Sequence, residues 1–162
     1  MIRPATIDDL PVVYGLVHEL ATYEREPDPV VATEQHFRDA LFGDDPKAFC
    51  LVAEDDSGDV VGFAMWFLNF STWLGTHGIY LEDLFVRPAA RGGGHGRALL
   101  TELARIAVDR GYGRVEWAVL DWNEPAQGFY ANLGAKPQAD WTVWRLTGDA
   151  LTDLGTRHRH RG

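Results

Sequence analysis

Residues 80–100 read YLEDLFVRPAARGGGHGRALL, and four of the five positions from 92 to 96 are glycine. An apolar run typical of a strand precedes these glycines, and apolar residues at helical spacing follow them. A helix N-terminus offers free N–H groups and a partial positive charge, and glycine lets the backbone approach an anion closely. With Arg91 and Arg97 as cationic donors, the stretch predicts a pyrophosphate-binding loop.

Two common phosphate motifs do not fit this loop. A P-loop ends in Gly-Lys-Ser/Thr, which is missing here. The dinucleotide fingerprint G-x-G-x-x-G fails as well, because its third glycine would be Arg97 when read from Gly92, and Leu99 when read from Gly94. The stretch matches R-x-x-G-x-G, beginning at Arg91. A flexible loop without a ligand stays open as an alternative at this point.

The remaining pattern predicts an α/β protein of one domain. A capping box at Thr6 and Asp9 predicts the start of a helix, and EPDP at 26–29 predicts its end. Thr33 is the expected N-cap of a second, shorter helix, which ends at Gly43. The later elements are expected to be strands at 48–54 and 60–70 joined by a hairpin, a loop at 71–78, a strand at 79–86, a helix at 98–113, a strand at 114–120, a helix at 123–135 and a strand at 141–146. The order βααβββαβαβ combines an antiparallel hairpin with a parallel crossover.

Composition narrows the class of protein. The chain is 46% hydrophobic and 24% charged, as in ordinary globular proteins, and its net charge is −9. That charge argues against nucleic-acid or anionic-membrane partners and is compatible with a cationic substrate. The single cysteine, Cys50, lies in an apolar run and fits a reducing cytoplasm. We expect no membrane span, and the histidine spacing indicates no metal site.

The loop and its neighbours resemble the GNAT superfamily of N-acetyltransferases. Residues 80–100, followed by AVLDWNEPAQGFYANLGA at 118–135, look like the polyamine (spermidine/spermine) and thialysine acetyltransferase branch, as do IRPAT, ELATYE and LVAE. The resemblance spans about residues 2–147. It implies an acyl-CoA N-acyltransferase fold, with a mixed, mostly antiparallel sheet, a central splayed pair of parallel strands and helices on both faces. It also implies acetyl-CoA as cofactor and a homodimer. We expect one N-acetyltransferase domain at 1–155 and, from the terminal sequence TRHRHRG, a disordered tail at 156–162.

The resemblance also implies how the cofactor is held. Backbone groups of the central strand would bind the pantetheine arm, and loop amides would bind the pyrophosphate. Asn123 would contact the end of the pantetheine arm, although a plain helix N-cap is an equal interpretation of this residue. The implied cofactor-binding residues are Leu84, Phe85, Val86, Arg91, Gly92, Gly93, Gly94, His95, Gly96, Arg97, Asn123 and Tyr130.

Three residues carry the expected chemistry. Glu82 is the candidate base, acting through water, and Asp83 is a contact for the substrate ammonium. Strand alternation places these carboxylates on opposite faces unless a bulge re-aims one of them. The alternative is that both face an edge or form salt bridges. Tyr130 is the candidate acid, because a phenol stays protonated at neutral pH and can donate.

The substrate side is assigned by resemblance to Tyr23, Glu24 and Trp144, together with Glu82 and Asp83. The predicted function is direct transfer of an acetyl group, in a ternary complex, to a primary amine of a diamine, polyamine or thialysine-like amino acid. Two alternatives remain open: acetylation of a protein lysine or N-terminus, and a non-catalytic acyl-CoA sensor.

Overall fold

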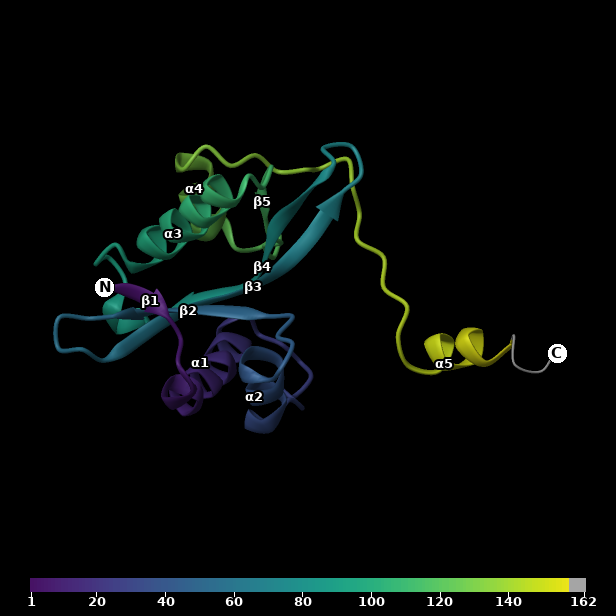
Figure 1. Ribbon diagram of the computed structural model, residues 1–162, viewed down its shortest axis with the longest axis horizontal. Helices are drawn as coiled ribbons and strands as arrows, with labels where there is room; N and C mark the ends of the chain where they lie inside the picture. Colours follow the sequence, from purple (N-terminus) through teal and green to yellow (C-terminus); the bar gives the residue numbers. More distant parts are fainter. Residues whose placement is uncertain (158–162) are drawn as a thin grey trace. The chain divides into compact units, whose positions relative to one another are not determined.

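The computed structural model describes residues 1–157 and divides into two compact units, Met1–Leu120 and the part from Asp121 onward, which are described separately. The first unit is built on a five-stranded sheet in the order β1-β2-β3-β4-β5 (Figure 1). Its strands are β1 (Ile2–Pro4), β2 (Phe49–Glu54), β3 (Val60–Ser71), β4 (Thr76–Val86) and β5 (Val115–Glu116). Neighbouring strands are antiparallel except for the parallel pair β4 and β5. The α/β class and the mixed sheet predicted from the sequence are confirmed.

Helices cover both faces of this sheet (Figure 1). Helix α1 (Leu10–Tyr23), preceded by the short 3-10 helix η1 (Ile7–Asp9), and helix α2 (Glu34–Phe42) lie on one face, and α3 (His95–Arg110) lies on the other. The inner side of α1 packs into a core cluster whose members include Leu16, Leu20, Phe63, Met65 and Phe85. Burial of these side chains is what fixes α1 against β3 and β4.

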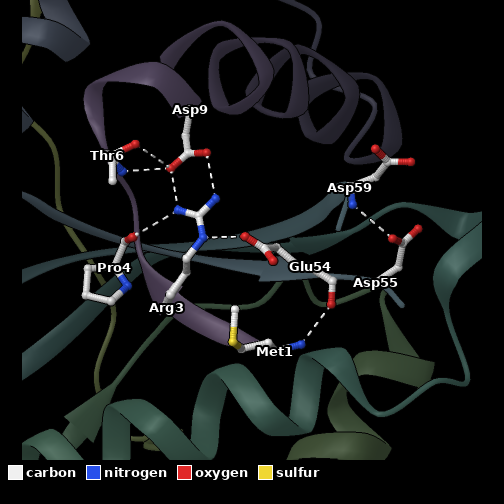
Figure 2. Close-up of polar contacts among 8 residues, drawn as sticks. All are labelled: Met1, Arg3, Pro4, Thr6, Asp9, Glu54, Asp55 and Asp59. Carbon is white, nitrogen blue, oxygen red and sulfur yellow. Dashed lines mark hydrogen bonds and ion pairs between the residues drawn. The ribbon is translucent and has the colours of Figure 1, made fainter. Parts of the chain in front are cut away.

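A polar network fastens the N-terminal corner of the sheet (Figure 2). The Arg3 guanidinium donates from Nη1 to Asp9 Oδ2 at 2.7 Å and from Nη2 to Asp9 Oδ1 at 2.9 Å, and its Nε donates to Glu54. The Thr6 amide donates to Asp9 Oδ2 at 2.7 Å. The Arg3 guanidinium is the main reason why the pKa of the Asp9 carboxyl lies below its usual value. The network ties β1 to η1 and β2.

Local signals for helix ends and turns are confirmed. Thr33 Oγ1 accepts the His36 amide at 3.2 Å as the N-cap of α2, and Gly43 is its C-cap. Gly111, at φ 73°, ends α3. The β2–β3 connection is a tight hairpin in which Asp55 Oδ1 accepts the Asp59 amide at 3.0 Å (Figure 2). Each of these features depends on neighbours within a few residues.

Three predicted elements differ from the structure. Residues 71–78 are not one loop, because β3 reaches Ser71 and β4 starts at Thr76, with only a tight turn between them. The strand predicted at 114–120 is reduced to the two residues of β5. The strand predicted at 141–146 is absent: this stretch has an apolar alternation but pairs with no strand within residues 1–157, and Val143 is 83% exposed.

The second unit contains α4 (Glu124–Asn132) and α5 (Gly148–Thr156). Helix α4 follows the predicted cap at Asn123, while α5 was not predicted. The predicted tail began at residue 156, but Thr156 is the last residue of α5 and Arg157 is its C-cap. Residues 158–162 lie outside the described residues. The single domain at 1–155 stays a prediction. None of the helices within residues 1–157 is long and apolar enough to cross a membrane.

Candidate functional site

A β-bulge in β4 places the two adjacent carboxylates. Asp83 pairs with Met65 and Leu81 pairs with Trp66, so Glu82 is the extra residue between these pairs. A bulge of this kind reverses the alternation of side chains along the strand. Met65 belongs to the core cluster under α1, and Asp83 opposite it therefore faces the α1 side of the sheet. The bulge allowed for in the sequence analysis is present, and it turns Asp83 toward the end of α1.

Three carboxylates act on one another at this place. Burial raises the pKa of Asp83 to about 7, with further contributions from the charges of Glu82 and Glu24. Burial also raises the pKa of Glu24, which the charges of Glu26 and Glu82 raise further. Among the ion pairs found in residues 1–157, none includes Glu24, Glu82 or Asp83. A positive charge beside this acidic group would lower the cost of ionising it.

The glycine loop, residues 91–97, follows β4 and a short 3-10 turn, η2 (Pro88–Ala90), and runs into the first turn of α3. Gly92 has φ 89° and Gly94 has φ 81°, in the left-handed region that side-chain-bearing residues avoid. Gly94 is the N-cap of α3, so the amides of the first turn of a sixteen-residue helix point toward the loop. An anion-binding loop requires this backbone geometry, and the binding of a pyrophosphate there stays a prediction.

The arginine that opens the loop makes contacts that the sequence did not reveal. Arg91 Nε donates to the Val86 carbonyl at 3.0 Å, and Arg91 Cζ lies 4.7 Å from the centroid of the Tyr23 ring. Tyr23 was predicted only as a substrate contact. Another arginine, Arg87, contacts Glu19, which lies on α1 like Tyr23; Arg87 Nε is 3.2 Å from Glu19 Oε2. Tyr23 and Glu19 lie 68 positions before the arginines that they contact, so no local pattern could have indicated these two contacts.

The parallel strands separate just before the residues assigned to the pantetheine arm. The β4–β5 pairing consists of Ile79 with Val115 and Tyr80 with Glu116. Beyond it, Leu84, Phe85 and Val86 pair only with β3 among the strands of the described residues. The pantetheine-binding role that the resemblance implies for these backbone groups stays a prediction. The Val86 carbonyl already accepts the Arg91 hydrogen bond.

The other predicted site residues lie in the second unit. The Asn123 side chain is buried and its Oδ1 accepts the Ala126 amide at 3.4 Å, which confirms its role as a helix cap. Tyr130 is half-buried on α4, with its ring centroid 5.5 Å from that of Phe129. Trp144 is 92% exposed. The cofactor, acid and substrate roles assigned to these residues stay predictions.

The separated parallel strands and the glycine loop are arranged as the resemblance implies, and the comparisons with known proteins show the family. The profile described as "Acetyltransferase (GNAT) family" matches residues 13–135, and the chain belongs to this family. It is therefore a GNAT N-acetyltransferase, as the sequence resemblance predicted.

Two of the similar curated proteins are named acetyltransferases of particular amines. The chain is 38% identical over 164 residues to a thialysine N-epsilon-acetyltransferase of Bos taurus, covering 95% of this chain and 96% of the relative. It is 34% identical to an L-ornithine N5-acetyltransferase of Arabidopsis thaliana, covering 93% of this chain and 85% of the relative. A solved integron cassette protein from the mobile metagenome of V. cholerae superposes with a TM-score of 0.79 at 27% identity, covering 96% of both chains.

Proposed function

We propose that this protein transfers an acetyl group from acetyl-CoA directly to a primary amine of a small molecule, in a ternary complex. The acceptor class is a diamine, a polyamine or a thialysine-like amino acid. The observation that carries the proposal is the acidic group of Glu24, Glu82 and Asp83, in which the pKa of Asp83 is raised to about 7. The names of relatives that act on thialysine and L-ornithine support an alkylamine acceptor.

The loop and strand of the first unit fit the proposed cofactor. Gly92 and Gly94 hold the left-handed conformations that let the loop amides converge on a pyrophosphate, and Arg91 and Arg97 add positive charge. The open side of β4 at residues 84–86 would hold the pantetheine arm. When bound, acetyl-CoA supplies an activated acetyl group; the protein supplies the proton transfers and the binding of the amine.

The amine must lose a proton before it can attack. An alkylammonium has a pKa near 10.4, so only about one molecule in 10³ is neutral at pH 7. We propose Glu82 as the base, acting through water, with Glu24 and Asp83 binding the ammonium. Asp83 is a second candidate for the base, because a pKa of about 7 suits proton transfer at neutral pH.

Two further roles complete the proposal. Tyr130 donates a proton to the leaving thiolate, and Trp144 adds an aromatic wall for the substrate. A Tyr130→Phe variant keeps the ring and removes the proton donor, so turnover should fall by about 10²–10⁴-fold while the affinity for CoA changes little. Unchanged turnover would remove Tyr130 from the acid role.

A thiol-release assay tests the function. Acetyl-CoA is offered with diamines, polyamines, L-ornithine and thialysine, and separately with peptides that carry a free N-terminus or a lysine. Release with a small amine supports the proposal, and release with peptides alone would establish the protein-acetylating alternative. Binding of CoA with no release for any acceptor would indicate the sensor. The pH profiles of Glu82→Gln and Asp83→Asn identify the base.

We also propose a homodimer, in keeping with the resemblance. The second unit exposes several large apolar side chains, more than a solvated surface ordinarily carries. They are Trp141 (75% exposed), Val143 (83%), Trp144 (92%), Leu146 (48%), Leu151 (52%) and Leu154 (50%). Light scattering after size exclusion tests the dimer, and a monomer at micromolar concentration would exclude it. The cytoplasm is the proposed location, where the single thiol of Cys50 would stay reduced.

A further inference from the structure

The side chain of Arg91 turns back from the glycine loop onto helix α1. Its Cζ lies 4.7 Å from the centroid of the Tyr23 ring and 5.6 Å from that of Phe85. These two rings are themselves 6.3 Å apart, and Phe85 is only 4% exposed. The cation that opens the anion loop is therefore packed on the last residue of α1, and that residue rests on the core.

The same end of α1 carries one carboxylate of the acidic group. Glu24, the C-cap, directly follows Tyr23, and its amide donates to the Leu20 carbonyl at 2.8 Å. Arg25 comes next with φ 57°, a left-handed conformation that side-chain-bearing residues seldom adopt. This closed turn links the Tyr23 ring to the Glu24 backbone with little freedom. The charge of Glu24 acts on Asp83, so the turn that follows Tyr23 carries part of the acidic group.

We propose that Tyr23 is a positioning residue that couples cofactor binding to amine binding through the Arg91 guanidinium. The proposal rests on the proposed function, which assigns the loop to a pyrophosphate and the carboxylates to an amine. Arg91 Nε is held by the Val86 carbonyl, and the two Nη atoms carry four more N–H bonds. These can bind an anion while the guanidinium stays on the ring.

An anion at the loop then gives the stacked guanidinium a second anchor. The anchored guanidinium holds the Tyr23 ring, and through it Glu24, in the position that an amine requires, so less order is lost when the amine binds. Coupling between two binding sites is reciprocal, and each ligand tightens the other by the same factor. A cation–π contact at a half-exposed ring sets this factor at about two- to fivefold.

Calorimetry on the full chain measures the coupling. The Kd of CoA is determined alone and with saturating putrescine, for the wild type, Tyr23→Phe and Tyr23→Leu. The wild type should bind CoA about two- to fivefold more tightly with putrescine. Tyr23→Phe should keep this factor because the ring remains, whereas Tyr23→Leu should lose it. Glu19→Gln is the matched control: it breaks the Arg87–Glu19 ion pair on the same helix and leaves the stack intact.

A second readout needs no amine. Titration with CoA, followed by NMR, should shift both the Arg91 Nε–H resonance and the ring resonances of Tyr23. Equal coupling in wild type and Tyr23→Leu would overturn the proposal while acetylation of amines continued. If no amine is acetylated but CoA shifts both sets of resonances, the proposed function fails and the link between loop and helix stands. No shift of Tyr23 at saturating CoA, or no CoA binding at all, would overturn the coupling.

Discussion

Replacing Asp83 by asparagine should change how stability depends on pH. In the folded wild type, burial and two neighbouring carboxylates raise the pKa of Asp83 from its ordinary value of 3.8 to about 7. The unfolded chain therefore releases this proton at lower pH than the folded chain. The stability tied to Asp83 is full below about pH 4 and is lost as the pH rises through about 7. Asparagine carries no proton to release, so the variant escapes this loss.

The size of the effect follows from the shift in pKa. One pKa unit corresponds to about 1.4 kcal/mol, and at pH 5 the unfolded wild type has already lost the proton that the folded form keeps. Between pH 5 and pH 8 the stability of Asp83→Asn relative to wild type should rise by about 2–3 kcal/mol, or about half that where water screens the partly exposed carboxyl.

Urea denaturation of both proteins at pH 5, 6, 7 and 8 measures this difference. Asp45→Asn serves as the control, because Asp45 is 81% exposed in its pair with Lys47 and should change stability by less than about 0.5 kcal/mol at every pH. A stability difference between Asp83→Asn and wild type that stays constant from pH 5 to pH 8 would refute the claim that Asp83 is half-buried beside like charges. A difference that shrinks with rising pH would refute it more strongly.

Three further variants test the framework of the site. Arg3→Met should lower the free energy of unfolding by about 1.5–3 kcal/mol at pH 7, measured by urea denaturation, because the buried Asp9 loses its partner. This loss should shrink as the pH falls through the lowered pKa of Asp9, and an equal loss at acid and neutral pH would contradict the ion pair. Gly94 has φ 81°, which alanine adopts only with strain, so Gly94→Ala should lower the free energy of unfolding by about 1–2 kcal/mol and weaken CoA binding in calorimetry. Unchanged values for both would contradict a loop that needs a left-handed residue at this position to bind CoA. Thr33→Ala removes the cap of α2 and should cost about 1 kcal/mol in thermal or urea unfolding, with no effect on CoA affinity.

Features set by neighbouring residues could be predicted from the sequence. The cap at Thr33, the end of α3 at Gly111 and the hairpin after Asp55 each depend on residues only a few positions away, whereas α3 begins at His95, three residues before the predicted start. The backbone conformation of the glycine loop belongs to this group, because its glycines stand in one short stretch; the binding of an anion there stays a prediction. The same stretch also carried the resemblance that the family comparison confirms.

Features set by a distant partner could not be predicted in this way. The extent of a strand depends on what lies beside it, so 114–120 and 141–146 show strand-like alternation although only Val115–Glu116 pairs. The bulge at Glu82 depends on the register with β3, which decides that Asp83 faces α1. The stack of Arg91 on Tyr23 requires α1 and the glycine loop to meet, and composition alone does not indicate this contact.

The most direct test of the central claim is a competition in one reaction. Acetyl-CoA is supplied in limiting amount to the protein together with putrescine, L-ornithine, thialysine and a lysine-containing peptide, and the acetylated products are identified by mass spectrometry. We expect a small alkylamine to receive the acetyl group and the peptide to stay unmodified. Acetylation of the peptide alone, or complete recovery of acetyl-CoA with every amine unmodified, would contradict it.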